Sequence, residues 1–503
     1  MDTSRGNEET RDQTVTRREL VAASGMAVVG GKVGQTQTAP TAAHAGPPLR
    51  VRAVLTYSVP RRQDATSWRS WGGIQTDAQA EAERRRIGDE LATMARSASF
   101  PVDILPVVAV QNEAQAAAAA AGDFDVLIIY AAGAWSNVFQ IMSKPGRWNL
   151  MFLRHSPGPV YLWYEIAHPH FLRKAVDEYG EPGWTTDDVV VDNYERLASR
   201  LRALYGLKRT LGKRIVTVGG ASGWGAGGGQ APEIARKVWK LDVVDCSYAD
   251  LGKRLEAAHK NAALRERANR RAEEYLRLPG TRLETRRGFF ENAFILDGVL
   301  REVMAEAGTD AITINACMGT IMPISRTTAC MPLSWMNDDG YLAFCESDFV
   351  VIPSGILLHY ISGTPVFLND PTFPHDGIVT CAHCTAPRKM DGKRLEPVRI
   401  LTHFESDYGA APKVEMRKGQ VTTNLIPDFA CKDWVGFAGT IVANPFLDIC
   451  RSQIDIRIRG DADLVARRMK GFHWMLSYGD YLDEAGYALG KLGIGWQNVS
   501  KAT

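Results

Sequence analysis

Residues 337–348 have the sequence Asn-Asp-Asp-Gly-Tyr-Leu-Ala-Phe-Cys-Glu-Ser-Asp, an acidic turn followed by a short apolar segment. The apolar segment, Tyr341–Cys345, is a predicted strand, and Glu346 and Asp348 follow it. Residues two apart on an extended chain point to the same side, so we expect both carboxylates to face one pocket and Ser347 to face away. Carboxylates at the end of a buried strand are costly without a partner, and a metal ion is a natural partner. The alternative is a pair of solvated acids in a loop.

The chain before this stretch alternates between strands and helices. Predicted strands are Val51–Tyr57, Phe100–Val108, Asp125–Tyr130 and Pro159–Tyr164, and predicted helices are Asp77–Ser97, Glu113–Ala121 and Asp192–Tyr205. Such alternation is typical of a doubly wound parallel sheet. A second series of the same kind begins with a strand at Arg214–Val218 and includes helices over about 248–278 and 291–307. We therefore predict two α/β domains, over residues 49–210 and 211–363.

The chain after residue 364 is rich in strand and turn signals. Predicted strands are 365–369, 398–405, 413–417, 420–425 and 454–459, and Arg417–Gln420 has the pattern of a hairpin turn. Tyr481–Leu492 is a predicted terminal helix. The predicted fold class is thus α/β, with two doubly wound domains followed by an antiparallel, barrel-like β-rich domain over 364–503.

Length and composition bound the classes of function. A chain of 503 residues is too long for one hydrophobic core. It is 45% hydrophobic and 23% charged, with a net charge of +2, which argues against nucleic acid as a partner because a phosphate-binding surface is strongly basic. No apolar run is long enough to cross a membrane. Several of the eight cysteines lie in apolar runs, which favours free buried thiols.

The N-terminus has the features of an export signal. Thr16–Val21, Thr-Arg-Arg-Glu-Leu-Val, resembles a twin-arginine motif, and a short apolar stretch, Leu20–Gly31, follows it. Ala43-His-Ala45 matches the small-x-small pattern of a signal cleavage site, in which any residue stands between two small ones. We predict that residues 1–48 are signal and linker, and that the protein is periplasmic or secreted by the twin-arginine route. The alternative is a disordered tail that contains two arginines.

A glycine-rich loop, Gly219–Gly229, follows the first strand of the second α/β unit. Gly223, Gly225 and Gly228 fit G-x-G-x-x-G, and Asp245 lies about twenty residues on, which together match the dinucleotide-binding fingerprint. Against this interpretation, a segment this rich in glycine produces the pattern by chance, and no arrangement for hydride transfer follows it. We favour a substrate-facing loop, and a plain connection remains open.

Acids and histidines are frequent in the C-terminal half of the chain. Hard divalent cations such as Mn²⁺ or Mg²⁺ favour carboxylates together with an imidazole. Glu346, Asp348 and one of the histidines would satisfy that preference. The histidines that follow the two acids include His383 and His473.

Four stretches in this half match a known family in order. Met336–Asp348 resembles the "LNDEG…CExD" stretch of the L-fucose/L-arabinose isomerase superfamily, and Ile361–Asp370 is similar to its "LTGxPxFxxD" stretch. Cys381–Pro387 is similar to "HCGxAP", and Gly471–Asp480 resembles "GxHxxLxYGD". The N-terminal half is similar to the family only in its α/β layout and in its Gly-Gly-x-Ser-x-Trp loop.

The resemblance implies a fold and an activity. It implies two α/β domains plus an antiparallel domain, a trimer or hexamer, and an Mn²⁺-dependent aldose–ketose isomerase that acts on a small sugar. It implies that Glu346, Asp348 and His473 hold the metal, with Mg²⁺ as an alternative ion. Aldose–ketose exchange moves a proton between C1 and C2 through an ene-diol, and a carboxylate moves that proton. We assign Glu346, Asp348 and His383 as catalytic residues, with Glu346 as the proton shuttle and His383 as a polar substrate contact or a further ligand.

The chain departs from the family at one position. The family has another acid a little over twenty residues before Glu346, whereas this chain has Met322–Thr328, with Arg326 and no acid. Asp338 or Asp339 could substitute, or Glu346 itself could take the role. Otherwise the metal site is altered or lost, and the isomerase reaction with it.

Three residues are predicted substrate contacts, Arg326, Trp224 and Asp370. Arg326 in place of the acid would recognise an acidic or modified sugar. Two other classes of function remain as alternatives to a metal-dependent sugar isomerase-like enzyme. One is a non-catalytic periplasmic sugar-binding protein, and the other is a nicotinamide-dependent oxidoreductase that uses the 219–229 loop.

Overall fold

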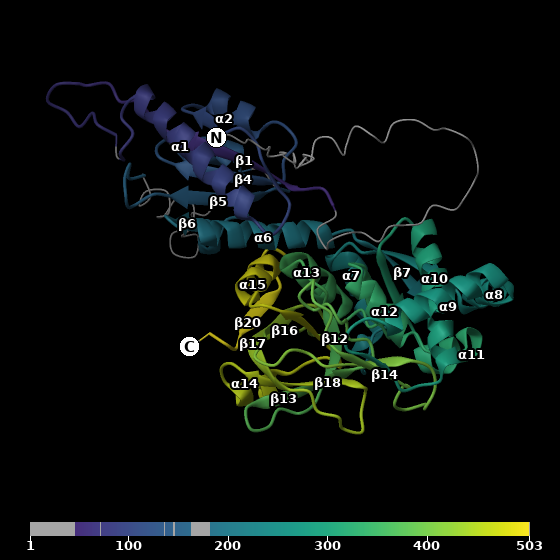
Figure 1. Cartoon of the computed structure of the whole chain (residues 1–503). Coiled ribbons are helices and arrows are strands. Elements are labelled where there is room, and N and C mark those ends of the chain that lie inside the picture. The colour runs from purple at the N-terminus through teal and green to yellow at the C-terminus, as the bar shows by residue number, and fades with distance from the viewer. Residues whose placement is uncertain (1–45, 71, 135, 144–145, 162–181, 502–503) are drawn as a thin grey trace, which may run out of the picture. The chain divides into compact units, whose positions relative to one another are not determined.

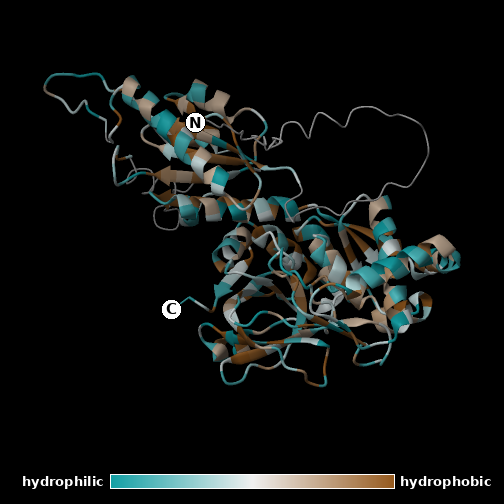
Figure 2. Ribbon diagram, in the orientation of Figure 1, coloured by the Kyte–Doolittle hydropathy of each residue, from teal (hydrophilic) through white to brown (hydrophobic). Residues whose placement is uncertain are grey.

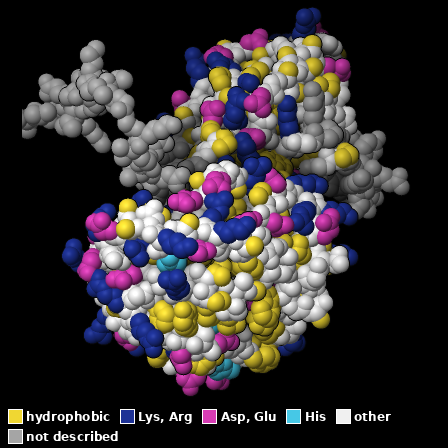
Figure 3. Space-filling model, turned by 90° about the vertical axis from the view of Figure 1, so that its right-hand side faces the viewer, with side chains coloured by type: hydrophobic (Ala, Val, Ile, Leu, Met, Phe, Trp, Pro, Cys, Tyr) yellow, Lys and Arg dark blue, Asp and Glu magenta, His cyan; other side chains and the backbone are white. Residues whose placement is uncertain are grey.

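The computed structural model describes residues 46–501, except 71, 135, 144–145 and 162–181 (Figure 1). The predicted export signal and its cleavage pattern lie outside the described residues. No helix among the described residues is long and apolar enough to cross a membrane. Basic and acidic side chains are mixed over the face drawn in Figure 3.

The first sheet is parallel and has the strand order β2-β1-β4-β5-β6, with β3 also paired to β1. Its strands are β1 (Leu49–Thr56), β2 (Val102–Ile104), β3 (Val108–Val110), β4 (Val126–Ala131), β5 (Trp148–Leu153) and β6 (Val189–Val191). Its helices are α1 (Asp77–Ser97), α2 (Glu113–Ala120), α3 (Ser136–Met142), the short η1 (Thr186–Asp188) and α6 (Tyr194–Thr210).

Helices cover both faces of this sheet. Ile87 of α1 and Leu201 of α6 share a core with alternate residues of β1, such as Val51. Ala116 of α2 and Phe139 of α3 pack with side chains of the opposite face. Every residue of β4 is buried, as expected for a parallel strand covered on both sides. The first α/β unit is therefore doubly wound.

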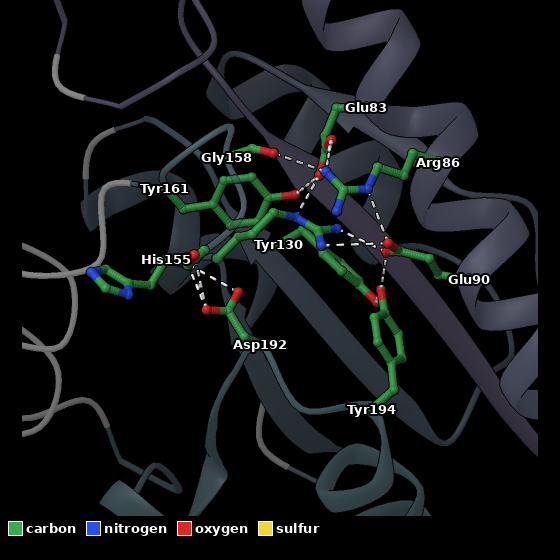
Figure 4. A network of polar contacts seen from close by, with 11 residues as sticks. Glu83, Arg86, Glu90, Tyr130, His155, Gly158, Tyr161, Asp192 and Tyr194 are labelled. Atoms are coloured by element: carbon green, nitrogen blue, oxygen red, sulfur yellow. Dashed lines mark hydrogen bonds and ion pairs between the residues drawn. The ribbon is translucent and has the colours of Figure 1, made fainter.

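A buried ion-pair network joins this sheet to α1 (Figure 4). Arg154, directly after β5, donates to Glu83 and Glu90, each at 2.9 Å. Tyr161 also donates to Glu83, and Tyr194 donates to Glu90 at 2.6 Å. The charges are almost fully removed from water, since the side chains of Arg154 and Glu83 are 4% and 3% exposed. The network is satisfied within itself, which is how buried charges are tolerated.

The second sheet is also parallel, with the order β11-β10-β7-β8. Its strands are β7 (Arg214–Val218), β8 (Asp242–Cys246), β10 (Ala311–Ile314) and β11 (Leu342–Cys345). Its helices are η2 (Gly228–Gln230), α7 (Ala231–Val238), α8 (Tyr248–Lys260), α9 (Ala262–Leu276), α10 (Arg287–Glu306), η3 (Cys317–Ile321), α11 (Met322–Ser325), α12 (Cys330–Asp338) and α13 (Ile352–Ser362). Val216 packs with α8 and α10 on one face, and Ile215 packs with α7 on the other.

The C-terminal part contains a closed, six-stranded antiparallel barrel. The ring runs β16-β19-β12-β13-β18-β17 and returns to β16, and β20 adds to β17 in parallel. Its strands are β12 (Phe367–Pro371), β13 (Ile378–His383), β16 (Val421–Ile426), β17 (Asp433–Ala443), β18 (Ser452–Ile458), β19 (Trp474–Tyr478) and β20 (Gly495–Asn498), with α14 (Ala462–Arg468) and α15 (Leu482–Gly490). The predicted fold class is confirmed. Figure 2 shows hydrophobic residues along many of the strands.

Helix α13 is buried along its whole length. It packs against both α6 and β19. A helix that is apolar around its whole circumference needs partners on every side, and α13 has them.

Several predicted elements differ from the observed ones. Residues 417–420 are not a hairpin turn, because β15 (Ala411–Val414) pairs with β14 (Val398–Leu401) and not with β16. β14 also pairs with β9 (Thr281–Leu283), across the predicted boundary at residue 364. The predicted long helix over 248–278 is broken at Asn261, whose side chain caps α9. Residues 159–161 form no strand, and the rest of that predicted strand lies outside the described residues; the strand here is β5.

Candidate functional site

The chain turns sharply where β11 ends. Glu346 and Ser347 have φ angles of 63° and 48°, in the left-handed region that side chains other than glycine seldom adopt. Thr313 at the end of β10 accepts a hydrogen bond from the Ser347 N–H at 3.1 Å and helps to hold the turn. The prediction that residues 346–348 continue the strand is therefore wrong.

The glycine-rich loop is hydrogen-bonded to this turn. Ser222 N donates to Ser347 O at 3.2 Å, and Phe349 N donates to Ser222 O at 3.0 Å. Trp224 N donates to the Asp348 carboxylate at 3.2 Å. A Cβ on Gly223 would lie 2.2 Å from Gly228 O, so the loop needs glycine to fold back on itself. The G-x-G-x-x-G spacing thus has a structural reason in the packing of this loop.

Asp245, the acid of the dinucleotide fingerprint, lies within β8. It accepts a hydrogen bond from Thr217 of the neighbouring strand β7. The fingerprint places its acid on a ribose hydroxyl, beyond the strand end. Asp245 instead contacts its cross-strand neighbour Thr217, which does not support a role in binding a dinucleotide.

Asp348 is fully buried and contacts His473. Its Oδ2 lies 2.7 Å from His473 Nδ1, and its Oδ1 accepts from the backbone N–H groups of Trp224 and Val350. With Nδ1 held in this way, the Nε2 atom of His473 faces the other side chains of the site. Asp348 therefore orients His473, a role that carboxylates commonly have behind histidines that bind metals.

Three side chains, those of Glu346, Asp370 and His383, lie around His473 Nε2. Asp370 Oδ1 lies 3.2 Å from this atom and Glu346 Oε2 lies 3.4 Å from it. The other carboxylate oxygen of Glu346 lies 3.6 Å from His383 Nε2. Asp370 and His383 belong to β12 and β13, while His473 directly precedes β19. The register of β12 and β19 pairs Asn369 with Trp474, which makes Asp370 and His473 cross-strand neighbours.

Three polar atoms of this group are buried and make no well-aligned hydrogen bond among the described residues, although they face each other or Glu346 as ion pairs at 3.2–3.6 Å. They are Asp370 Oδ1, His383 Nε2 and His473 Nε2. One ligand atom from each of these three residues lies within 4.8 Å of the others, close enough to hold one metal ion. Buried polar atoms without a well-aligned hydrogen bond are costly, and a cation between them would satisfy all three. Nitrogen and carboxylate ligands in this mixture suit a divalent first-row metal.

The electrostatics of the group favour positive charge at its centre. Burial raises the pKa of Glu346, but His383 and His473 outweigh burial and hold it well below its usual range. Burial lowers the pKa of His473, but Asp348 and Glu346 raise it to about 9. Burial raises the pKa of Asp370, although both histidines oppose this. Either protonated histidines or a bound cation can supply that positive charge.

A pocket of about 400 Å³ lies beside Glu346. It is at the carboxyl ends of the strands of the second sheet, where open α/β sheets bind ligands. The residues that line it come from the glycine-rich loop, from the turn after β10 and from the end of β11: Ser222, Gly223, Trp224, Gly225, Asn315, Ala316, Cys317, Met318, Gly319 and Glu346. Glu346 is the one carboxylate among them, and it links the pocket to the two histidines.

An aromatic wall stands at this pocket. Trp224 stacks on Phe472, with ring centroids 5.0 Å apart, and meets His473 edge to face at 6.0 Å. The Trp224 side chain is partly exposed, so its face is accessible to a ligand. The structure therefore brings the predicted substrate contact Trp224 to the pocket.

Arg326 does not contact this group. It is exposed at the end of α11, with a φ angle of 57°, and its charge lowers the pKa of His259 on α8. It is not among the residues that line the pocket. The structure therefore does not support the predicted role of Arg326 as a substrate contact, because the short helix α11 places it near α8 and away from the pocket.

The carboxylates proposed as substitutes for the missing acid are used elsewhere. Asp338 accepts from Lys389 N at 2.6 Å, and Asp339 pairs with Arg301 at 2.8 Å. Both precede β11, whereas the candidate site lies at its other end. Asp370, predicted only as a substrate contact, instead supplies a second carboxylate beside Glu346.

No family model matches the chain, and no curated protein matches it. The resemblance to the L-fucose/L-arabinose isomerase superfamily remains a hypothesis, based on four short stretches of sequence.

Proposed function

We propose that this protein is a metal-dependent aldose–ketose isomerase-like enzyme that acts on a small sugar. The observation that carries the proposal is the cluster of three buried ligand atoms, on Asp370, His383 and His473, beside a carboxylate that reaches a pocket. The resemblance to the superfamily supports the choice of reaction.

Asp370, His383 and His473 are the proposed ligands of a divalent ion such as Mn²⁺, with Glu346 next to them. When bound, such an ion polarises a carbonyl and stabilises the negative charge that develops on oxygen. Asp348 holds His473 in the orientation that this requires. The second carboxylate that the family places before Glu346 is here replaced by Asp370, from a different strand.

Glu346 is the proposed proton shuttle between C1 and C2 of the sugar. Its side chain is 25% exposed, while Asp348 behind it is fully buried. It faces the pocket in its ionised form, because the two histidines lower its pKa and favour the charged carboxylate. A base must reach the carbon-bound proton, and Glu346 is the carboxylate that lines the pocket.

The pocket suits a polyhydroxylated molecule of small size. Its volume of about 400 Å³ lies within the range of small-molecule sites. The Trp224 ring offers an apolar face, and the side chains of Ser222 and Asn315 offer polar groups at the lining. Sugars carry both kinds of surface.

The test is an isomerase assay with Mn²⁺ on the purified protein. A panel of aldoses is incubated with the enzyme, and ketose formation and the exchange of the C2 hydrogen in D₂O are followed by NMR. We expect conversion with metal and none after chelation. Glu346→Gln should lower kcat about 10²–10⁴-fold, because the proton shuttle is lost.

Glu405→Gln is the matched control, since Glu405 is an exposed carboxylate of the same half of the chain. Its activity should equal that of the wild type. Sugar binding without conversion and without metal would instead support the sugar-binding protein. Full activity of Glu346→Gln would overturn the assignment of the shuttle.

A further inference from the structure

Cys345 lies between the second sheet and the candidate metal group. It is the last residue of β11, and its side chain is buried. One ligand atom each of Cys345, Glu346 and His383 lie within 4.8 Å of one another. This second group shares His383 with the group that contains Asp370 and His473.

Further thiols surround Cys345. Cys317 and Cys384 lie near enough to influence the pKa of its thiol. The Cys384 sulfur lies 3.7 Å from His383 Nδ1, so sulfur atoms border the His383 ring on this side. None of the eight cysteines is in a disulfide, and the expected free thiols are confirmed.

We propose that Cys345, Glu346 and His383 form a second cation position, for a thiophilic ion such as Zn²⁺ or Cd²⁺. The two positions differ in ligand chemistry. A thiolate with an imidazole selects soft and borderline metals, whereas Asp370 and the two histidines also accept harder ones. The position itself does not depend on the proposed isomerase activity, because it needs only the three side chains.

Binding at this position releases protons. The thiol of Cys345, and His383 where its ring is protonated, lose hydrogen to solvent as the bonds to the metal form, and no electrons are transferred. Each ring nitrogen of His383 can donate its lone pair to one ion at a time. The two positions share His383, so a thiophilic ion that binds the nitrogen facing Asp370 and His473 would compete with an ion at that position.

The test is a Cd²⁺ titration of the reduced protein, followed by the ultraviolet absorption of the cadmium–thiolate bond. The wild type should show this absorption at one equivalent of Cd²⁺. Cys345→Ser and Cys345→Ala should lose it. Cys381→Ser should keep it, because Cys381 is also buried on β13 but is outside the group. Asp370→Asn should keep it as well, because Asp370 belongs to the other position.

X-ray absorption of the zinc-loaded wild type gives a readout that needs no variant. We expect a sulfur ligand at about 2.3 Å. A shell of nitrogen and oxygen alone would overturn the proposal, and so would an absorption band that persists in both Cys345 variants or disappears in Asp370→Asn. Failure of the isomerase assay leaves these spectra unchanged, so the two proposals fail separately.

Discussion

The Asp348 carboxylate has both of its oxygens engaged by the protein. One contacts His473 Nδ1, and the other accepts two backbone N–H groups. A residue in this position affects metal binding through the histidine that it orients. Such supporting groups typically change metal affinity by about 10–100-fold when they are removed.

Asp348→Asn should therefore weaken Mn²⁺ binding about 10–100-fold without abolishing it. The amide oxygen can still accept the N–H groups of Trp224 and Val350, but the amide NH₂ group opposes the Nδ1–H of His473. Isothermal titration calorimetry measures the affinity. Asp370→Asn, which removes a proposed ligand, should cost more. Equal losses of Mn²⁺ affinity in the two variants would instead indicate that Asp348 is a direct metal ligand, as the sequence predicted.

The residues of the site were largely predictable, while some of their roles were not. Glu346, His383, His473, Asp370 and Trp224 all lie at the candidate site, as expected from their motifs. The left-handed turn at 346–347 sends Asp348 behind His473, and no spacing rule reveals such a turn. Asp370 becomes a candidate ligand because strand register places it opposite His473, and register depends on pairing between distant segments.

Cys345 was missed as a site residue. The signal was present, since Cys345 is the residue before Glu346 at the end of a predicted strand. Alternation along a strand assigns adjacent residues to opposite faces, which made Cys345 a core residue and Glu346 a site residue. The turn that begins at Glu346 removes that alternation.

Among the elements, the best predicted were those with strong local signals. Helix α1 begins and ends as predicted, because Thr76 caps an alanine- and glutamate-rich segment at Asp77. β7 also has its predicted bounds. β19 was missed, because all five of its residues, Trp474–Tyr478, are buried and show no polar alternation. Whether β15 pairs with β14 or with β16 is decided by tertiary packing, and a turn signal could not decide it.

The buried ion pairs of Arg154 connect β5 to helix α1, so loss of the arginine should destabilise the contact between these elements (Figure 4). Arg154→Met should lower the free energy of unfolding by about 3–5 kcal/mol, because the buried Glu83 keeps only the Tyr161 hydroxyl and a longer ion pair with Arg86 at 3.7 Å. Urea unfolding measures this change. The double variant Arg154→Met, Glu83→Gln should regain part of the loss, because the unpaired charge is gone.

Arg214→Met is the control for this prediction. Arg214 forms an ion pair with Asp242 at 2.7 Å, but both side chains are about half exposed. Exposed pairs contribute about 0–1 kcal/mol. Similar small losses for the two arginines would contradict the inference that burial makes the Arg154 network important.

At the scale of the whole molecule, the candidate metal group joins two structural layers. Glu346 belongs to the turn after the second sheet, while the other three residues belong to the barrel. An ion held by all of them would link sheet and barrel in the folded state. An ion that binds only the folded state must also stabilise it.

Mn²⁺ at one hundred times its dissociation constant should raise the free energy of unfolding by about 2.7 kcal/mol. Thermal unfolding with Mn²⁺ and after chelation checks this. Asp370→Asn should lose most of the metal-dependent gain. Asp376→Asn should keep it, because Asp376 is exposed and its φ of 49° suits asparagine. A gain of the same size in Asp370→Asn would place the ion elsewhere.

Some predictions for the whole chain remain predictions. The twin-arginine export route concerns residues outside the described part. The trimer or hexamer, the sugar substrate and the domain boundaries at 210 and 363 likewise follow from sequence alone. Pairing between β9 and β14 shows that the last two predicted domains share a sheet.

The closed barrel also determines which part of the site can move. Asp370 and His383 lie on strands that are hydrogen-bonded to neighbours on both sides, and His473 is next to such a strand. No strand of a closed ring can slide without breaking two ladders, so these three side chains are expected to keep their spacing. Glu346 lies outside the ring, in a turn held by a few hydrogen bonds. Any adjustment to a bound ligand is therefore expected at Glu346 and at the glycine-rich loop bonded to its turn.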